Sequence, residues 1–356
     1  MTVSERFIVP AAGAQSSGGN RYNDGFLAAL GASAERFEPE AALRALRAGE
    51  PGFYWLDTLY LAHWSALRAI APLGALGLLV HYLPSLVEHR GEIRRELLSE
   101  AERSALDRAD ALLVTSCWMR EALERLVPDP QRLLVVEPGR EPAPGLQPAP
   151  PATGMRALLV AHLVPGKGVV ALLRALAREL DGADPLELSV IGAPRDPAYA
   201  AECHALVAND PKLARVVTFA GELAPAGVLA RMAESNVLLS SSHFEAYGMA
   251  LAEARSVGLP IVARAGGNAG ALVGPATGGE LCPDDGALAT ALLRLCRDPA
   301  LHAERLERAQ RTRLAPRPWS EAARDFNAQR RCLRAGERCP LAANGTTNEM
   351  REQTTR

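Results

Sequence analysis

SSSHFEAYGMALAEARSVGLPIVARAGGNAG (240–270) shows the fold class of this chain more clearly than any other segment. The apolar run VLLS that leads into it (237–240) is typical of a buried parallel strand. Ala250–Val257 is rich in helix formers, Gly258 ends the helix, and Pro260 opens a second strand, PIVAR. A strand, a turn, a helix and a second strand in this order predict a parallel α/β sheet.

Two glutamates, Glu245 and Glu253, stand eight residues apart in this segment. If the whole segment were helical, their side chains would project within roughly 80° of one face and lie about 12 Å apart. That separation suits one extended ligand held at two polar points. The backbone N–H groups of Tyr247-Gly248-Met249 would lie at a helix N-terminus, which favours anions. A surface helix with two solvated glutamates stays open as the other interpretation.

The same segment resembles the E-x7-E signature of family 4 glycosyltransferases. In that family a Ser-rich strand end is followed by Glu, an aromatic-Gly turn, Glu-Ala and Gly-hydrophobic-Pro, and every piece is present between Ser240 and Pro260. The resemblance implies a GT-B fold, in which two Rossmann-like parallel-sheet domains face each other across a cleft. It also implies that Glu245 contacts the transferred sugar, Glu253 the ribose hydroxyls, and the Gly248-Met249 amides the donor diphosphate.

Length and composition narrow the class of protein. A chain of 356 residues is about two domains' worth, and its net charge of −2 does not favour nucleic acid as a partner. Six scattered cysteines without C-x-x-C spacing argue against zinc and against a disulfide scaffold. No apolar run reaches about 18 residues and no secretory signal is recognised, so we expect a cytoplasmic protein. Peripheral contact with a membrane stays open, although no basic amphipathic helix stands out.

Residues 1–140 are predicted to form an acceptor-side Rossmann-like domain. RFIVP (6–10) is typical of a first strand, and a helix is expected from about Asp24. The glycine pair Gly18-Gly19 between them would let the backbone approach a ligand, and a plain loop is the alternative. The resemblance implies that this loop faces the donor phosphates. It adds three acceptor-side candidates: Asn20, Arg21 and Asn23.

The rest of this domain is predicted to alternate strands with helices. His81 stands at the end of an apolar run, 76–83, where parallel sheets place their ligands. A structural role stays open for a single histidine, whereas the resemblance makes His81 the residue that approaches the donor sugar. The other elements expected here are a strand entering a helix over 53–61, a polar helix over 86–108, strands over 111–116 and 132–138, and a helix from Trp118.

A proline-rich segment, Glu141–Thr153, separates the two predicted domains. It holds five prolines in 13 residues, which is typical of an extended linker. The second domain is expected over 154–318 and would bind the nucleotide sugar. The start Pro318-Trp319-Ser320 resembles that of the closing helix in GT-B proteins, so a helix over 319–334 is expected to cross back to the first domain. Residues 335–356 are polar and aperiodic and are predicted to be disordered.

A lysine, Lys167, lies near the start of the second predicted domain. HLVPGKG (162–168) follows a predicted strand and does not match a phosphate-binding Walker loop. The family carries Arg-x4-Lys here, with both cations on the donor diphosphate; Lys167 matches and His162 stands where arginine is usual. Histidine is only partly charged near neutral pH and has no bidentate fork. A solvated lysine at a helix start stays open for Lys167.

Glycine-rich turns complete the predicted donor site. Gly266, Gly267 and Asn268 form a turn whose amides could face phosphate. Family members often have Glu three residues after this glycine pair, whereas this chain has Gly270. Leu223 follows a strand end where the family holds the nucleotide base by backbone. Further strands are expected over 156–161, 186–192 and 215–221, and helices from Val169 and over 199–208, 226–234, 286–297 and 300–313.

These residues and the resemblance predict a retaining glycosyltransferase that moves a sugar from a nucleotide-diphosphate donor to an acceptor, which is a glycan, a lipid or a small molecule. The sequence contains no Asp-x-Asp pair, so we expect transfer without a metal and without a cofactor beyond the donor. Two other functions stay open. His162 and Gly270 would suit a catalytically weak nucleotide-sugar-binding partner subunit on the same fold. A nucleotide-sugar epimerase or a phosphorylase is the third, although no pyridoxal-binding context is found.

Overall fold

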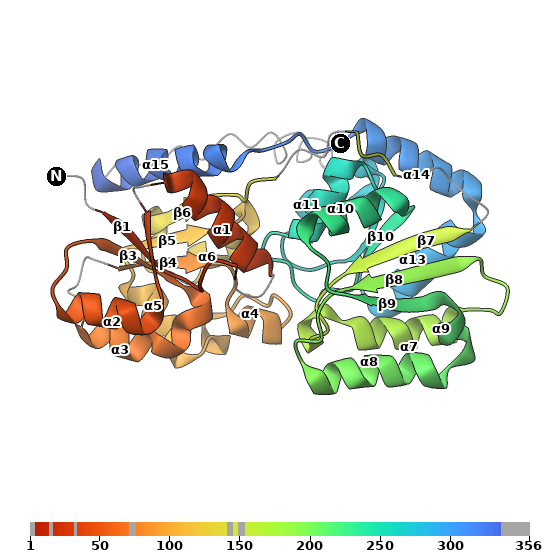
Figure 1. The fold of residues 1–356 in the computed structure, drawn as a ribbon, viewed down its shortest axis with the longest axis horizontal. Helices are drawn as coiled ribbons and strands as arrows, with labels where there is room; N and C mark the ends of the chain where they lie inside the picture. The colour runs from red at the N-terminus through yellow and green to blue at the C-terminus, as the bar shows by residue number, and fades with distance from the viewer. Residues whose placement is uncertain are drawn as a thin grey trace. The chain divides into compact units, whose positions relative to one another are not determined.

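The computed structural model describes residues 4–13, 17–31, 34–70, 76–140, 145–148 and 154–335, which form two compact units (Figure 1). Unit 1 takes residues 1–141 together with 317–356, and unit 2 takes residues 142–316. The predicted linker is described only at 145–148, and the predicted tail lies outside the described residues from position 336 onward. None of the described helices is both long and apolar enough to cross a membrane.

Unit 1 contains a parallel sheet of six strands in the order β2-β1-β3-β4-β5-β6. The central strands β4 and β5 are apolar throughout and fully buried, as expected where helices cover both faces of a parallel sheet. The strands are β1 (Glu5–Ile8), β2 (Ala34–Phe37), β3 (Phe53–Asp57), β4 (Leu76–Val80), β5 (Ala111–Val114) and β6 (Leu133–Val135). The helices are α1 (Gly18–Leu30), α2 (Pro39–Arg47), α3 (Trp64–Ile70), α4 (Pro84–Glu88), α5 (Glu100–Arg108), α6 (Cys117–Glu124) and α15 (Trp319–Ala335).

One part of the core of unit 1 lies between this sheet and the helices α1 and α15. Phe26 of α1 and Phe326 of α15 meet edge to face, with ring centroids 5.3 Å apart, and Phe326 also packs on Trp55 of β3. In Figure 1, α2, α3 and α5 lie on the opposite face of the sheet. The strand order reverses at β1, whose neighbours are β2 and β3. In open α/β sheets such a reversal marks the place where ligands bind, at the carboxyl ends of the strands.

Unit 2 repeats this architecture with the strand order β12-β11-β10-β7-β8-β9, again with every pair parallel. Its order reverses at β7, which lies between β8 and β10. The strands are β7 (Met155–Val160), β8 (Leu186–Ile191), β9 (Val217–Gly221), β10 (Val237–Ser240), β11 (Ile261–Arg264) and β12 (Glu280–Cys282). The helices are α7 (Val169–Glu179), α8 (Pro197–Asn209), α9 (Pro211–Val216), α10 (Pro225–Glu234), α11 (Met249–Val257), α12 (Ala269–Leu272), α13 (Asp285–Arg297) and α14 (Pro299–Arg311).

Helix α15 is held on unit 1 by a buried carboxylate at the amino end of β1. Glu5 Oε1 accepts hydrogen bonds from Arg330 at 3.1 Å and Arg334 at 2.9 Å. Glu5 Oε2 accepts from Trp55 Nε1 at 2.6 Å. The guanidinium of Arg330 also lies 4.1 Å from the ring centroid of Phe53, which adds a cation–π contact. The last described helix of the chain therefore packs as part of the first sheet's core.

The polar helix predicted over residues 86–108 is wrong, because the structure has two helices there, α4 and α5. Between them the backbone takes positive φ at Arg90 (54°) and Gly91 (82°), a conformation that ends a helix. Helix α5 then begins with a capping box, in which Ser99 accepts from the Glu102 N–H and the Glu102 carboxylate accepts from the Ser99 N–H. Polar composition alone did not reveal this break.

The start of α1 was also predicted too late. The helix begins at Gly18 rather than near Asp24, because Ser17 Oγ accepts a hydrogen bond from the Asn20 N–H at 3.1 Å and caps it. Gly18 and Gly19 therefore lie in the first helical turn and not in a loop. Strand β2 and helices α2, α9 and α12 were not predicted at all. The remaining predicted strands and helices are confirmed, with ends that shift by a few residues.

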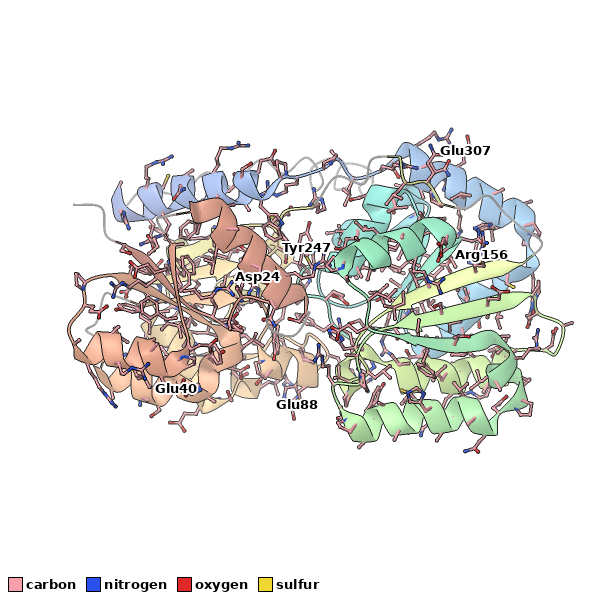
Figure 2. The ribbon with its side chains drawn as sticks, viewed as in Figure 1. Asp24, Glu40, Glu88, Arg156, Tyr247 and Glu307 are labelled. Atoms are coloured by element: carbon pink, nitrogen blue, oxygen red, sulfur yellow. The ribbon has the colours of Figure 1, made fainter. Side chains whose placement is uncertain are left out.

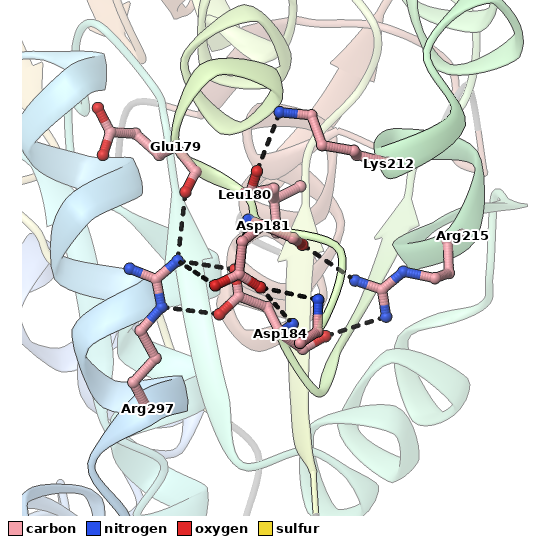
Figure 3. Close-up of polar contacts among 8 residues, drawn as sticks. Glu179, Leu180, Asp181, Asp184, Lys212, Arg215 and Arg297 are labelled. Atoms are coloured by element: carbon pink, nitrogen blue, oxygen red, sulfur yellow. Dashed lines mark hydrogen bonds and ion pairs between the residues drawn. The ribbon is translucent and has the colours of Figure 1, made fainter.

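The turn between α7 and β8 is anchored by a buried acid, Asp184 (Figure 3). Its carboxylate accepts from Arg297 Nε at 2.7 Å and Nη2 at 2.8 Å. Arg215 donates to the Asp184 carbonyl at 3.1 Å, and Lys212 Nζ donates to the Leu180 carbonyl at 2.9 Å. The hydrogen bond from Arg297 is the main reason that the pKa of Asp184 is lowered. The turn is thus closed by charged hydrogen bonds at the edge of the sheet away from the loops described next.

Asp184→Asn is expected to lower the free energy of unfolding by about 1–3 kcal/mol at neutral pH, the range for hydrogen bonds to charged groups. Because the folded pKa lies below the unfolded one, the carboxylate stabilises the fold above its ordinary pKa of about 3.9, and this stabilisation is lost as the pH falls through the folded value. The difference in melting temperature between wild type and variant should therefore shrink in acid. Glu202→Gln, which breaks an exposed pair with Arg174, is the matched control and should change stability little. Identical pH profiles for the two variants would contradict the assignment.

Candidate functional site

The loops that follow β7 and β10 are bonded to each other at the carboxyl edge of the unit 2 sheet. The N–H of His243 donates to the Gly166 carbonyl at 3.0 Å. Ser241 Oγ donates to the Lys167 carbonyl at 2.7 Å. Since β7 and β10 are neighbouring strands, the loop with Lys167 and the loop with the serine run form one surface.

The loop after β11 joins the same surface from the other side. The N–H of Asn268 donates to the Glu245 carbonyl at 2.7 Å, and Asn268 Nδ2 donates to the Tyr247 carbonyl, also at 2.7 Å. Figure 2 labels Tyr247 in the segment that leads into α11. Glu245 and Gly267 form an isolated parallel bridge. Two predicted donor-binding residues, Gly267 and Asn268, are therefore brought against the first glutamate of the E-x7-E pattern, and Gly266 lies against His243 of the same loop.

Glycine is required where these loops cross. Gly168 has φ 68° and Gly267 has φ 58°, both in the left-handed region. A Cβ on Gly168 would lie 2.3 Å from the Ser241 carbonyl oxygen, and one on Gly267 would lie 2.2 Å from the Glu245 carbonyl oxygen. A Cβ on Gly266 would meet the His243 carbonyl oxygen at 2.3 Å. The close packing of the three loops thus depends on glycine at these positions, because any side chain would collide with the backbone of the next loop.

Gly267→Ala is expected to destabilise unit 2 by more than about 1 kcal/mol, because alanine is strained at this φ and its methyl group meets backbone. The variant should also weaken ligand binding at this surface, since the Glu245 backbone must shift. Gly270→Ala is the matched control: Gly270 lies within α12, and an added Cβ there has only Leu281 Cδ1 nearby, at 3.8 Å. Thermal unfolding of the two variants measures the difference. Equal melting temperatures would show that the Gly267 turn can relax freely.

Lys167 and Glu245 meet at the centre of this surface. Lys167 Nζ lies 2.9 Å from Glu245 Oε1 and 3.2 Å from Ser242 Oγ. The Lys167 side chain keeps 33% of its surface exposed and that of Glu245 keeps 17%, so a ligand can reach the pair from solvent. The two residues are 78 positions apart in sequence, and the fold makes them an ion pair. Ser242, which was not among the predicted site residues, is the second hydrogen-bond partner of Lys167 Nζ.

The geometry first assumed for the two glutamates does not hold, because Glu245 is not on the helix. Helix α11 begins at Met249, after Gly248 with φ 94°, so only Glu253 is helical. Glu253 lies in the second turn of α11 and is buried. No side chain caps the N-terminus of α11, which leaves its first-turn amides for solvent or an anion.

His162 is hydrogen-bonded to the neighbouring loop through one of its ring nitrogens. Its Nδ1 accepts a hydrogen bond from the Ala193 N–H at 3.1 Å, which joins the loops after β7 and β8. Accepting that bond requires a lone pair on Nδ1, so the bond is lost if both ring nitrogens are protonated. The role of His162 beside Lys167 at the donor diphosphate stays a prediction, and this hydrogen bond restricts it to a ring that keeps a lone pair on Nδ1. Leu223 lies at the next strand end, half-buried between β9 and α10 and beside the Arg195–Glu222 ion pair.

In unit 1 the predicted His81 lies in a buried polar cluster at the carboxyl ends of β3 and β4. His81 Nε2 is 2.9 Å from Asn23 Oδ1 and 3.5 Å from Asp57 Oδ2. Asn23 Nδ2 donates to Asp57 Oδ2 at 2.7 Å, and the Leu59 N–H donates to Asp57 Oδ1 at 2.9 Å. Burial lowers the pKa of His81 and the charge of Asp57 opposes this, so the balance favours a neutral ring.

The glycine pair Gly18-Gly19 is close to this cluster, although it is helical. A Cβ on Gly19 would lie 3.2 Å from His81 Cδ2, so the first turn of α1 packs directly on the histidine ring. Asn20 and Arg21 lie in the same turn and the next one. Asp57 is the residue that the sequence reading missed in unit 1. Its signal was a single acid at the end of an otherwise apolar strand, FYWLD.

Family models match most of the chain. The model of the Glycosyl transferase 4-like domain matches residues 9–139, and that of Glycosyl transferases group 1 matches residues 155–298. The D-inositol 3-phosphate glycosyltransferase of Kribbella flavida is 28% identical over 294 residues, 73% of this chain and 67% of that protein. Those of Corynebacterium efficiens and Gordonia bronchialis are 29% and 26% identical, and the alignments span 43% and 57% of their lengths.

Solved structures show the same fold. Sucrose-phosphate synthase from Thermosynechococcus elongatus superposes with a TM-score of 0.70 at 20% identity, covering 94% of this chain and 100% of that one. HepE from Anabaena, solved in complex with UDP-glucose, gives a TM-score of 0.67 at 17% identity and covers 93% of this chain and 99% of its own. At these identities the likeness concerns the two-domain α/β fold.

Proposed function

The chain belongs to the family 4 glycosyltransferases with the two-domain GT-B fold, and on that premise we propose that it transfers a sugar from a nucleotide-diphosphate donor to a hydroxylated acceptor, with retention of configuration and without a metal ion. The observation that carries this proposal is the ion pair of Lys167 and Glu245 within a surface of glycine turns and helix amides. A cation, backbone amides and a carboxylate at one place suit a ligand that has a diphosphate next to a sugar.

Each member of this surface has a distinct part in the proposed reaction. As the bond between the anomeric carbon and the phosphate oxygen breaks, negative charge grows on the departing diphosphate, and Lys167 and the amides of Met249 and Gly267 neutralise it. Positive charge grows on the sugar, and Glu245 stabilises it. The acceptor oxygen bonds to the anomeric carbon on the same face, and its proton leaves with the nucleoside diphosphate. The absence of an Asp-x-Asp pair from the sequence supports a transfer driven by these groups.

The ion pair also indicates how the donor engages the site. Without ligand, Lys167 and Glu245 neutralise each other across 2.9 Å. A diphosphate carries more negative charge than one carboxylate, so it competes for Lys167 and releases Glu245 toward the sugar. Glu253 is proposed to hold the ribose and the Leu223 backbone the base. His162 would contribute a neutral N–H at Nε2, because its Nδ1 is engaged by Ala193.

A second function, a nucleotide-sugar-binding subunit with weak activity, is favoured by this same observation on His162. If His162 stays neutral, positions 162 and 167 offer the diphosphate one side-chain cation, Lys167, rather than two. Binding would then survive while the charge stabilisation needed for transfer is reduced. Purified protein that binds donor without releasing nucleoside diphosphate would support this alternative.

The sequence offers a sharp test, since only two of its 39 lysines and arginines are lysines, Lys167 and Lys212. Acetylation of both amines can be followed by mass spectrometry with and without UDP, GDP or ADP. We expect one nucleotide to protect Lys167 and to leave Lys212, which donates to the Leu180 carbonyl, unchanged. No protection of Lys167 by any nucleotide would overturn the donor site. Release of nucleoside diphosphate from the matching sugar donor, with D-inositol 3-phosphate as the first acceptor tried, then separates transferase from binding subunit.

A further inference from the structure

The His81 cluster is built from three segments that meet at the carboxyl edge of the unit 1 sheet. Asp57 ends β3, His81 follows β4, and these strands are neighbours; Asn23 reaches them from α1. The exposed fractions are 0% for Asp57, 1% for Asn23 and 7% for His81. At this depth each polar atom needs a partner of the right kind, so the hydrogen-bond directions can be worked out in turn.

The carboxylate sets the first direction. Asp57 accepts only, and its Oδ1 is engaged by the Leu59 N–H, so its Oδ2 must receive the Asn23 amide NH₂ at 2.7 Å. Asn23 is thereby turned with its Oδ1 toward His81. An amide oxygen also accepts only, so the hydrogen of the 2.9 Å contact belongs to His81 Nε2. The Asp57 oxygen at 3.5 Å favours the same placement.

The other ring nitrogen then has a lone pair. A neutral imidazole has one N–H, so hydrogen on Nε2 leaves Nδ1 as an acceptor. Gly19 packs on the Cγ–Cδ2 edge of the ring, where its Cβ would lie 3.2 Å from Cδ2 and 3.3 Å from Cγ. The edge with Nδ1 and Cε1 is the opposite one. Within the described part of the chain, the hydrogen bond found for this ring, to Asn23, and its charge contact with Asp57 are both at Nε2.

From this geometry we infer that Asp57 and Asn23 are positioning residues that hold His81 in the Nε2–H tautomer, so that Nδ1 accepts a hydrogen bond from a hydroxyl group of a bound sugar. The inference rests on the proposed function, because that function supplies the hydroxylated ligand. It also restricts the ligand: a phosphate or carboxylate oxygen offers no hydrogen to a bare Nδ1, whereas a hydroxyl does. The hydroxyl can belong to the donor sugar or to the acceptor.

The isosteric variant Asp57→Asn gives a direct test, because it should reverse the chain of hydrogen bonds. Its oxygen is expected to keep the Leu59 N–H, so its NH₂ faces Asn23, which must turn its oxygen toward position 57 and its NH₂ toward His81. His81 Nε2 then accepts, and the hydrogen moves to Nδ1. The double variant Asp57→Asn/Asn23→Asp restores an acceptor at position 23 and should restore the original tautomer.

The tautomer is read from ¹⁵N–¹H correlation spectra of histidine-labelled full-length protein, with His81→Asn used to assign the signal. We expect Nε2–H in wild type and in the double variant, and Nδ1–H in Asp57→Asn. The rate of transfer should fall about tenfold in Asp57→Asn, which corresponds to the loss of one hydrogen bond, and it should recover in the double variant. Glu5→Gln, a buried acid at the opposite end of the same sheet, is the control for folding and should keep the wild-type tautomer.

An Nδ1–H signal in the wild type overturns the inference even if transfer is intact, and so does an unchanged tautomer in Asp57→Asn. Conversely, a wild-type Nε2–H signal in a protein that transfers no sugar from any donor would count against the proposed function and leave the tautomer assignment standing. Titration of the wild type with UDP-glucose and with D-inositol 3-phosphate then shows which ligand moves the Nδ1 resonance. Movement by neither, in a protein that transfers sugar between them, would overturn the proposed hydroxyl contact.

Discussion

Lys167→Ala is expected to reduce the rate of sugar transfer by about 10²–10³-fold, the loss typical of removing one preorganised group from a site of developing charge. The reason is that Lys167 is the side-chain cation in the glycine-rich surface of unit 2, where it lies between Glu245 and Ser242. Without it the departing diphosphate keeps only uncharged partners among the proposed groups, the backbone amides and the His162 ring. The measurement is the initial rate of nucleoside diphosphate release with acceptor present.

Lys212→Ala is the natural control for that variant. Lys212 is the other lysine of the chain, belongs to the same unit, and is engaged at the Leu180 carbonyl beside the Asp184 turn. We expect it to change stability slightly and transfer very little. A Lys167→Ala enzyme with nearly full activity would end the assignment of the donor site, whereas equal losses in both variants would point to a general loss of folding.

Glu245→Gln is expected to separate binding from chemistry. We expect kcat to fall by about 10²-fold or more, because the neutral amide cannot stabilise positive charge at the anomeric carbon. Affinity for the nucleoside diphosphate should stay or rise, by up to about fivefold, since Lys167 is released from a partly exposed ion pair worth at most about 1 kcal/mol. Calorimetric titration with the nucleotide that protects Lys167, together with kcat, measures both effects.

Glu280→Gln controls for the loss of a carboxylate that pairs with arginine elsewhere in unit 2. Glu280 lies at the start of β12 and pairs with Arg294 and Arg305, away from the three loops. It should leave kcat and nucleotide affinity unchanged. If Glu245→Gln instead weakens nucleotide binding and leaves kcat intact, Glu245 acts on the diphosphate side and the proposed division of roles is wrong.

Much of the fold could be predicted because its signals are local. The run 237–240, the helix ended by Gly258 and the strand after Pro260 were located to within a residue or two, since an apolar run and a glycine or proline act on their immediate neighbours. Helices α7 and α13 were located equally well, because each combines an apolar periodicity with a clear start. Both parallel sheets could be predicted because strands alternate with helices along the chain.

The errors occurred where a boundary depends on a side-chain contact. The break between α4 and α5 is marked by Ser99 and Glu102, whose reciprocal hydrogen bonds matter more than the helix-forming composition around them. The start of α1 depends on Ser17 in the same way. The fully helical segment assumed for Glu245 and Glu253 is wrong because Glu245 lies before α11 and pairs with Gly267 in another loop, which no local pattern reports.

By itself the sequence determined the α/β class, the two-domain plan and the family, together with Lys167, Glu245 and His81 as candidates. The class, the family and the candidates can be recognised from short runs of residues, because each signal lies within one segment of the chain. The tertiary structure alone decided which groups the candidates contact: Glu245 meets Lys167, His162 is bonded to the Ala193 N–H, and His81 meets Asn23, which is itself bonded to Asp57. Such contacts join segments dozens of residues apart, and they exist because parallel strands bring their carboxyl ends to one edge, where hydrogen-bond direction and burial select the partners.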